Sequence, residues 1–337
     1  MHPVTSAMKV VTMGGPEEIE RSTQPADWPR LTAADLAAHA PDATWLVTNG
    51  DVVLARASAW WTAAPTLPGE SLGAIGHFAA SSRDAARLAL DTACEALRSR
   101  GATLAVGPMD GNTWRRYRLV VDAGIEPPFF LEPTNPPEWP RWFVDAGWKR
   151  HSEYVSSVND DLSRVDPAGV GKAQALAARG VVMRDLRLDE YDAELRRIYS
   201  VARVSFAGAY LYTPIEEDDF VAQYAAAKPA VVPSLVTIAE HDGIPVGFCF
   251  CVPDVNERAQ GRPMRTAILK TFAVLPGYTG LGGALADRTH AEARRLGFTR
   301  VIHALMHVSN DRSRALSKRI AHEIRRYALF ERRVREL

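Results

Sequence analysis

The sequence predicts an α/β protein of two similar domains, each a mostly antiparallel central sheet flanked by helices. Three observations support this fold class. The 337-residue chain is long enough for two domains. Its apolar content of 47% and charged content of 24% are those of a globular protein. An order of hairpin, strand, helix and strand occurs in the first half and again in the second, so one architecture is expected twice.

Elements of the first half follow a leader or edge segment, residues 1–30, which has little periodicity. Apolar or alternating runs typical of strands cover residues 44–63, 71–80, 102–109 and 147–158. Asn49-Gly50 divides the first of these runs and predicts a hairpin turn. Ser82 is placed to cap a helix that ends at Gly101.

Elements of the second half begin after residues 160–169, a polar stretch with Pro and Gly that reads as a linker. We therefore expect domains at 1–163 and 164–337. Strands are predicted at 181–188, 234–254 (a hairpin turning at Asp242-Gly243), 265–276, 299–308 and 323–334. Helices are predicted around 192–206, after a glycine-rich turn within 276–297, and from Asn310 or Asp311 to Ile320.

Composition excludes several classes of protein. There is no run of 18 apolar residues and no signal-like start, so we expect a cytoplasmic protein without a membrane partner. The net charge is zero, which does not suggest a DNA partner, although the second half is mildly basic and would suit an anionic ligand. Cys249 and Cys251 share one face of a strand and are expected in the core.

The segment VLPGYTGLGGAL, residues 274–285, carries the clearest functional signal. A strand leads into a turn that contains Gly277, Gly280, Gly282 and Gly283, and a helix begins there. The first amide groups of a helix have no partner inside it, and with the helix dipole they form a site for a phosphate or pyrophosphate. Glycine lets such a ligand approach the backbone closely.

This segment resembles the acyl-CoA motif of the GNAT N-acetyltransferases, a strand followed by Pro-x-Tyr-Arg-Gly-x-Gly-x-Gly/Ala and a helix. Residues 276–284 match it except that Thr279 replaces the arginine, and Gly277 stands where the family has Gln or Arg. The resemblance extends over roughly residues 180–337. The first half is similar to a degenerate second copy, because its corresponding turn, residues 79–84, has no glycine. The expected fold is therefore a tandem GNAT in which only the second copy binds CoA.

The resemblance implies that the chain transfers an acyl group directly from acetyl-CoA, or another acyl-CoA, to a small-molecule amine without a metal. It implies that a backbone N–H near Phe272–Val274 polarises the acyl carbonyl. The residues that it assigns to the cofactor are Phe272, Ala273, Val274, Tyr278, Thr279, Gly280, Leu281, Gly282, Gly283, Ala284 and Asn310.

Candidate catalytic residues are His307, Ser317 and Tyr210. His307 is the candidate base and shares a strand face with His303, for which a structural role is the alternative. Ser317 takes the place of the family's proton-donating tyrosine, although serine is a poor acid. Tyr210 falls where the family binds its acceptor. Lys270 interrupts an apolar strand and is expected either to pair with a buried carboxylate or to contact the acceptor.

Alternatives to this function are an aminoacyl-tRNA-dependent transferase and a non-catalytic protein that binds or senses CoA. The first half adds a stretch dense in polar and aromatic residues, 107–120, that either lines a cleft between the domains or holds a loop together. Two copies in one chain replace what single-copy relatives gain by dimerising, so we expect a monomer or a weak homodimer.

Overall fold

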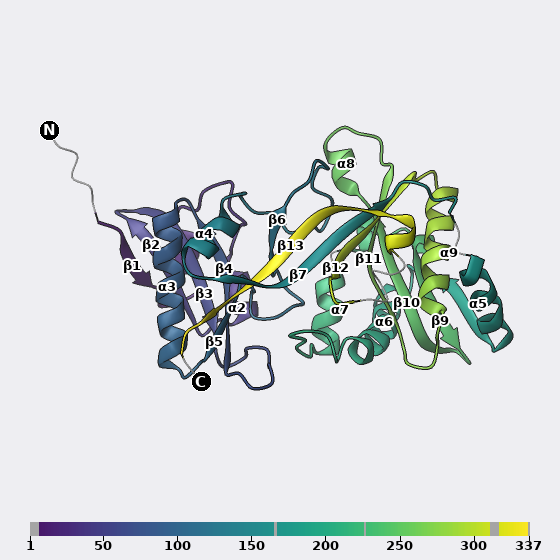
Figure 1. Cartoon of the computed structure of the whole chain (residues 1–337), viewed down its shortest axis with the longest axis horizontal. Helices are drawn as coiled ribbons and strands as arrows, with labels where there is room; N and C mark the ends of the chain where they lie inside the picture. The colour runs from purple at the N-terminus through teal and green to yellow at the C-terminus, as the bar shows by residue number, and fades with distance from the viewer. Residues whose placement is uncertain (1–6, 165–166, 226, 311–316, 336–337) are drawn as a thin grey trace.

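The computed structural model describes residues 7–164, 167–225, 227–310 and 317–335. Within them, thirteen strands form one continuous mixed sheet (Figure 1). The path of the sheet is β1-β2-β3-β4-β5-β13-β7-β12-β11-β10-β9-β8, and β6 pairs with β13 beside it. Two pairs, β4–β5 and β11–β12, are parallel and the others are antiparallel, which confirms the predicted α/β fold class. Among the described helices, none is both long and apolar enough to cross a bilayer.

The first domain contains most of the strands and helices that the first half of the sequence predicts. Its strands are β1 Lys9–Thr12, β2 Ala43–Asn49, β3 Val52–Trp60, β4 Leu72–Ala80, β5 Leu104–Gly107, β6 Leu119–Asp122 and β7 Lys149–Asn159. Its helices are α1 Glu18–Arg21, α2 Ala33–His39, α3 Arg83–Ser99 and α4 Trp139–Asp145. The hairpin at Gly50 is confirmed, and Ser82 caps α3 by accepting a hydrogen bond from the N–H of Ala85 at 3.3 Å.

The second domain has the order of strands that the sequence predicts but more helices than it predicts, and one of these begins within the expected linker. Its strands are β8 Val181–Asp185, β9 Val236–His241, β10 Ile244–Pro253, β11 Thr266–Val274, β12 Arg300–His307 and β13 His322–Arg333. Its helices are α5 Pro167–Ala178, α6 Tyr191–Ser205, α7 Glu217–Ala225, α8 Val255–Ala259 and α9 Leu281–Arg295, with short 3-10 turns at Lys228–Ala230 and Pro233–Leu235. Most of the helix expected from Asn310 to Ile320 lies outside the described residues.

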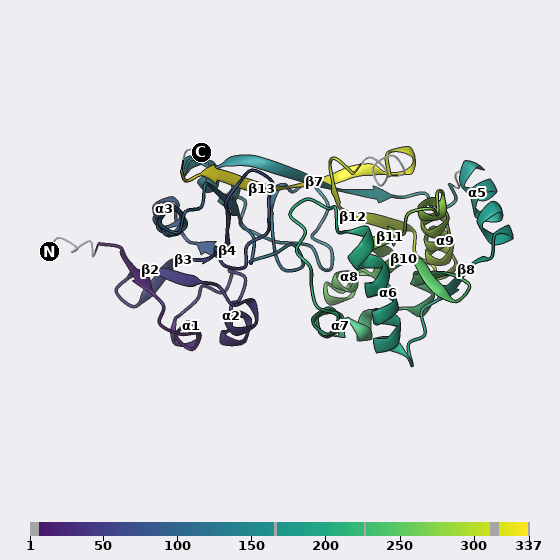
Figure 2. The ribbon, with the colours of Figure 1, turned by 90° about the horizontal axis from the view of Figure 1, so that it is seen from below.

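Each domain lends its last strand to the sheet of the other. β7 pairs with β12 of the second domain, and β13 pairs with β5 of the first. The two strands also pair antiparallel with each other, and Figures 1 and 2 show them spanning both halves of the molecule. The end of β13 therefore lies beside α3 in the first domain (Figure 1). The domain limits at 163/164 stay a prediction, and the exchange of strands was not foreseen.

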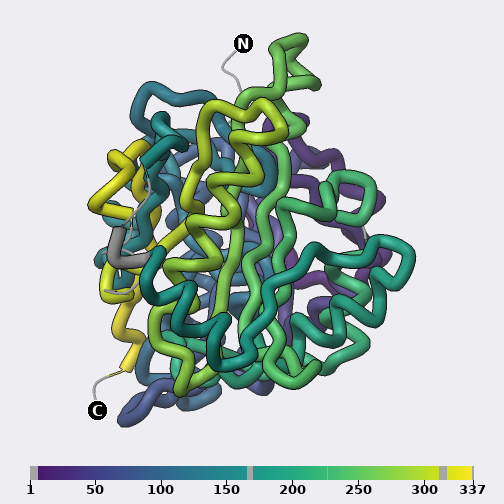
Figure 3. Tube along the Cα trace, turned by 90° about the vertical axis from the view of Figure 1, so that its right-hand side faces the viewer, coloured from purple at the N-terminus to yellow at the C-terminus, as the bar shows by residue number. Residues whose placement is uncertain are grey.

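The second domain's sheet is covered on both faces. Helix α9 packs on one face, against Cys249, Cys251 and Leu269 among others, so the expected core role of both cysteines is confirmed. Helices α6 and α7 cover the other face, with Phe248 and Phe250. Viewed from the end of this domain, its green segments lie in front of the purple first domain (Figure 3).

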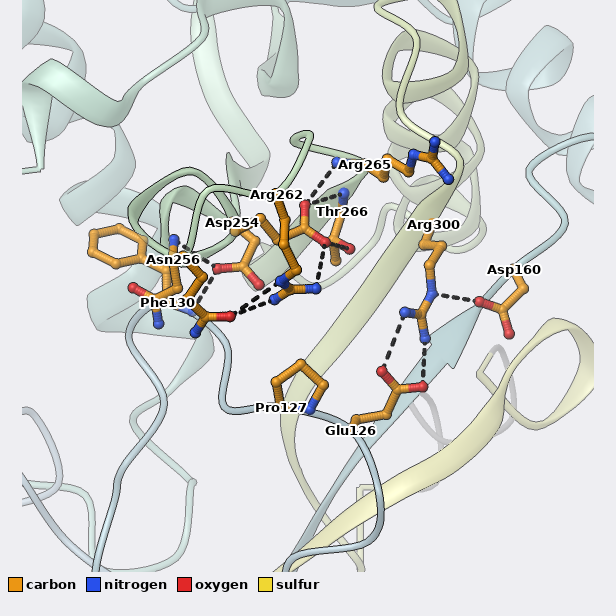
Figure 4. A network of polar contacts seen from close by, with 12 residues as sticks. Glu126, Pro127, Phe130, Asp160, Asp254, Asn256, Arg262, Arg265, Thr266 and Arg300 are labelled. Carbon is orange, nitrogen blue, oxygen red and sulfur yellow. Dashed lines mark hydrogen bonds and ion pairs between the residues drawn. The ribbon is translucent and has the colours of Figure 1, made fainter.

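A loop of the first domain, residues 123–138, is tied to the second domain by polar contacts (Figure 4). The carboxylate of Glu126 accepts two hydrogen bonds from the guanidinium of Arg300, at 2.8 and 3.2 Å. Arg300 also donates to Asp160 at 2.6 Å, and the N–H of Phe130 donates to Asp254 at 3.0 Å. The loop is thereby held over the strands that build the candidate site.

Candidate active site

The glycine turn leads directly from β11 into α9. Gly277 and Gly280 both have φ of 93°, a conformation that favours glycine. A Cβ atom on Gly280 would lie 2.9 Å from the side chain of Lys172 on α5, so this position has no room for a larger residue. A Cβ on Gly283, in contrast, would meet nothing within 4 Å. The unpaired backbone N–H groups at the start of α9 are thus flanked by glycines, whose lack of a side chain lets an anionic ligand come close.

The strands beside this turn form a wedge. Residues Thr266–Leu269 of β11 pair with Arg300–His303 of β12, and beyond these residues the two strands separate. Lys270 is the extra residue of a β-bulge, because Leu269 and Thr271 face consecutive residues of β10. Phe272, Ala273 and Val274 lie beyond the separation, in the part of β11 that borders the wedge.

The residues that the sequence assigns to the cofactor lie in and around this turn, some buried and some exposed. Tyr278 shares a hydrogen bond between its hydroxyl and His241 Nδ1 at 2.9 Å, and Thr279 is exposed. Leu281 and Ala284 are buried and help to anchor α9, while Gly282 lies against the ring of Phe272. The N–H of Asn310 donates to the carbonyl of His307 at 2.9 Å, which places Asn310 at the end of β12.

Two of the three candidate catalytic residues lie together. The ring centroids of His307 and Tyr210 are 6.1 Å apart. The N–H of Ser309 donates to His307 Nδ1 at 3.1 Å, so that nitrogen is an acceptor, and Nε2 lies 2.7 Å from the hydroxyl of Ser152. Burial, with the charges of Arg118 and His151, holds the pKa of His307 below its ordinary value. His307 is therefore neutral near pH 7, as a base must be.

Tyr210 ends a chain of polar contacts that crosses the domains. Its hydroxyl forms a hydrogen bond with His151 Nε2 on β7, and Nδ1 of His151 lies 2.5 Å from the carboxylate of Glu331 on β13. Neither His151 nor Glu331 was named from the sequence, because the exchange of strands brings them to Tyr210. Ser317 is not part of this group: its hydroxyl is buried and has no hydrogen-bond partner within the described chain.

The expectation that His303 and His307 share a strand face is wrong. His303 faces α9, where its Nε2 lies 2.9 Å from Nε2 of His290 and the two rings stack. The register shifts between His303 and Met306, and Leu305 has a φ of 61°. This irregularity interrupts the two-residue alternation, and His307 contacts Ser152 and Tyr154 instead. His303 has the structural role that was its alternative.

Lys270 forms no ion pair within the described chain, so the carboxylate partner considered for it is not found. Its ammonium group donates to the backbone carbonyl of Leu131 at 3.1 Å. Burial, with the charge of Arg118, lowers the pKa of Lys270 to about 7, and Glu132 acts in the opposite direction. A lysine with this pKa exchanges protons near neutral pH, at the point where the wedge begins.

An apolar pocket lies next to the wedge on the α6 and α7 face. It is lined mainly by aromatic and aliphatic side chains, from Trp114, Leu195, Ile198, Ala202, Phe206, Phe220, Tyr224, Phe248, Phe250 and Thr271. Trp114 comes from the first domain, and its indole N–H donates to the carbonyl of Thr213 at 2.8 Å. The stretch 107–120 thus reaches the second domain. The space left is about 20 Å³, so a ligand chain would have to displace some of these rings.

The corresponding wedge of the first domain is filled by its own chain. β4 and β5 are paired only from Leu72 to Ala74 before they separate. The carboxylate of Asp110 enters the gap and accepts a hydrogen bond from the N–H of His77 at 2.6 Å. A Cβ on Gly76 would lie 2.2 Å from the carbonyl of Met109. This packing gives a physical reason to expect no CoA in the first copy.

A cavity of about 200 Å³ adjoins this filled wedge. His39, His77 and Asp110 offer potential metal ligands within 4.8 Å of one another, and His39 Nδ1 lies 2.8 Å from His77 Nε2. Arg115 and Arg56 donate to the carbonyls of His39 and His77, at 2.9 and 3.0 Å. These positive charges oppose a bound cation, and the absence of a metal stays a prediction.

Comparisons with known proteins agree with this geometry. The model of the acetyltransferase (GNAT) family matches residues 194–321. A bacterial ceramide synthase of Caulobacter vibrioides (strain NA1000 / CB15N) is 26% identical over 223 residues, which are 65% of this chain. The chain spans 58% of that protein's length.

Solved structures support the fold of the whole chain. A tandem GNAT protein from the clavulanic acid biosynthesis pathway has a TM-score of 0.50 at 15% identity, covering 98% of this chain and 100% of its own. A GCN5-related N-acetyltransferase from Sphaerobacter thermophilus has a TM-score of 0.51 at 14% identity, covering 97% and 96%. Both likenesses concern the arrangement of the two domains and not their substrates.

Proposed function

We propose that the chain, whose residues 194–321 match the model of the acetyltransferase (GNAT) family, transfers an acyl group from an acyl-CoA to the amine of a small molecule. The observation that carries this proposal is the wedge between β11 and β12, which opens beside a glycine turn at the start of α9. Acetyl-CoA is the simplest donor. The residues of the turn fit a pyrophosphate, because the space beside Gly283 is open and α9 supplies free N–H groups.

The reaction joins the amine nitrogen to the acyl carbon and breaks the carbon–sulfur bond of the thioester. The amine loses a proton, and the departing thiolate gains one. Backbone N–H groups in the Phe272–Val274 segment would polarise the carbonyl in this reaction. His307, neutral near pH 7, is the candidate base, and Tyr210 is the candidate acid, since Ser317 is a weak one. Their roles are part of the proposal.

The apolar pocket beside the wedge supports a substrate with a hydrocarbon chain. Its lining of aromatic and aliphatic side chains offers no charged partner. The similarity to a bacterial ceramide synthase is in keeping with an N-acyltransferase that acts on lipid-like molecules. We therefore propose that the donor or the amine acceptor carries an alkyl chain that enters this pocket.

Calorimetric titration of acetyl-CoA and dodecanoyl-CoA into the full chain tests the cofactor site. A Gly283→Asp variant adds a carboxylate where a Cβ has free space, so the fold should be kept while charge repels the pyrophosphate. We expect binding at least tenfold weaker, roughly 1.4 kcal/mol. Ser81→Asp, at the corresponding turn of the first domain, adds the same charge and should bind as the unaltered protein does.

The outcome also separates the alternatives. If neither acyl-CoA binds the unaltered protein, the proposal fails, and a transferase that uses aminoacyl-tRNA becomes the better hypothesis. If acyl-CoA binds but no amine is acylated, a protein that senses CoA is favoured. A monomer or weak homodimer, the absence of DNA and membrane partners and a cytoplasmic location stay predictions.

A further inference from the structure

Arg118 is a buried cation without the partners that burial requires. It lies within the stretch 107–120 that reaches the second domain, and only 8% of its surface is exposed. Its guanidinium carbon lies 4.0 Å from the centre of the Tyr117 ring and 4.2 Å from that of Tyr154. In the part of the chain that the structure describes, its Nε and Nη1 atoms are buried without a hydrogen-bond partner. Buried donors left unpaired are costly, so this arrangement indicates a missing acceptor.

The surroundings of Arg118 carry an excess of positive charge. Lys270 and His307 both lie within its electrostatic influence, and it lowers the pKa of each. The nearby carboxylate of Glu132 is already engaged: it accepts a hydrogen bond from Arg325 at 2.9 Å and another from the hydroxyl of Tyr327. Glu132 is therefore shared by Arg325 and Lys270, and within the described chain Arg118 has no carboxylate as an ion-pair partner, which leaves its charge for an anionic ligand to neutralise.

The position of Arg118 relates this anion to the acyl acceptor. Lys270 marks the residue at which β11 leaves β12, and His307 is the last residue of β12. Tyr154, which stacks on Arg118, also packs edge-on against His307. The glycine turn, in contrast, belongs to the side of the sheet that α9 covers. An anion at Arg118 would thus lie beside the reacting end of the wedge and apart from the CoA phosphates.

We propose that Arg118 binds a carboxylate carried by the acyl acceptor close to its amine. This inference rests on the proposed function and specifies its substrate class: an amphiphilic amino acid whose alkyl chain enters the apolar pocket. A guanidinium is suited to this task, since its planar donors match the two oxygens of a carboxylate. The two tyrosine rings fix the plane of the guanidinium, and the carboxylate in turn orients the amine.

The first test compares two acceptors with the unaltered protein. Undecylamine and 2-aminododecanoate have the same alkyl chain on the carbon that carries the amine, and only the second carries a carboxylate. With one acyl-CoA donor, we expect kcat/KM to be at least tenfold higher for 2-aminododecanoate. Equal or lower values for the carboxylate-bearing acceptor would overturn the proposal.

The second test measures binding without the reaction, so that it stays informative if transfer itself fails. Dodecanoate, which has the chain and the carboxylate but no amine, is titrated into the full chain below its micellar concentration. Arg118→Gln should weaken its binding at least tenfold, and Arg118→Lys should restore part of it. Arg100→Gln is the matched control. Arg100 also stacks on an aromatic ring, that of Trp61 at 5.0 Å, but lies in the first domain and away from Lys270 and His307.

Thermal unfolding with and without dodecanoate distinguishes a variant that has lost the binding site from one that is misfolded. The unaltered protein and Arg100→Gln should gain the same rise in Tm from the ligand, and Arg118→Gln should lose it. If Arg118→Gln binds dodecanoate as tightly as the unaltered protein does, Arg118 has only a structural role between the two tyrosines. Loss of acyl-CoA binding in Gly283→Asp should leave dodecanoate binding intact, which separates this inference from the cofactor proposal.

Discussion

The stacked histidines His290 and His303 show how a polar pair can be placed in a core. Burial lowers the pKa of His290 to about 4 and that of His303 to about 3, with the charge of His290 adding to the second shift. Both rings are therefore neutral in the folded protein at pH 7. Their common hydrogen bond of 2.9 Å satisfies one nitrogen of each ring.

Acid should destabilise the fold through this pair. Below pH 6.5 the unfolded chain protonates both histidines while the folded protein does not, so stability falls as pH falls. Each histidine should contribute a loss of about 2 kcal/mol between pH 7 and pH 5. Urea unfolding at both pH values checks this, with a His290→Phe/His303→Phe variant that should lose about 4 kcal/mol less. An equal loss in variant and parent would contradict the assignment.

The residues of the glycine turn could be predicted from the sequence, but the grouping of Arg118 with Lys270 and His307 could not. The turn depends on local backbone geometry, which a short run of glycines and a proline encodes. Arg118 meets Lys270 and His307 only through the tertiary fold, more than 150 positions away in the sequence. The density of arginine and aromatic residues in 107–120 was the only local signal, and it did not single out Arg118.

At the level of elements, we expect the apolar pocket between α6, α7 and β10 to determine which chain lengths are accepted. Phe206, at the end of α6, is half-buried and lines the pocket, so its truncation should cost less stability than that of a core ring. Phe206→Ala should lower kcat/KM for a dodecyl substrate roughly tenfold, because part of about 2 kcal/mol of burial is lost. The two-carbon homologue should be little affected.

Two controls accompany this variant. The dodecyl chain is placed once on the acyl donor and once on the amine, to find which of them enters the pocket. Phe130→Ala removes another half-buried ring that packs on the same core but does not line the pocket. A proportional decrease for short and long substrates, or the same decrease in Phe130→Ala, would argue against a chain-binding pocket.

Single elements were predicted more reliably than their pairing. The hairpins at Gly50 and at Asp242-Gly243 were identified because both turns require positive φ, which these residues tolerate. Helix α5 was missed because Pro and Gly at its start resemble a linker. The partners of β7 and β13 could not be predicted, since an alternating strand has the same pattern in either domain.

At the scale of the whole molecule, the exchange of strands makes the two domains depend on each other. Neither sheet is complete without a strand from the other half, so we expect one cooperative unfolding transition instead of two. All eight tryptophans lie at or before Trp148, and apart from Trp114, which packs on the second domain, their fluorescence reports on the first half. Its urea midpoint should coincide with that of far-ultraviolet circular dichroism, which reports on both halves. Separate midpoints would show that the domains unfold independently.

The pairing of β7 with β13 has a mechanical consequence. The second domain is, in effect, the connection of one very long hairpin: its arms β7 and β13 pair with each other, and β13 also pairs with β5 of the first domain. A force applied between β1 and the end of β13 would load the ladder of the first domain, where β5 holds β13. The wedge and its glycine turn would carry no tension until that ladder had ruptured. In an optical-tweezers experiment the two halves should therefore extend in a fixed order, the first before the second.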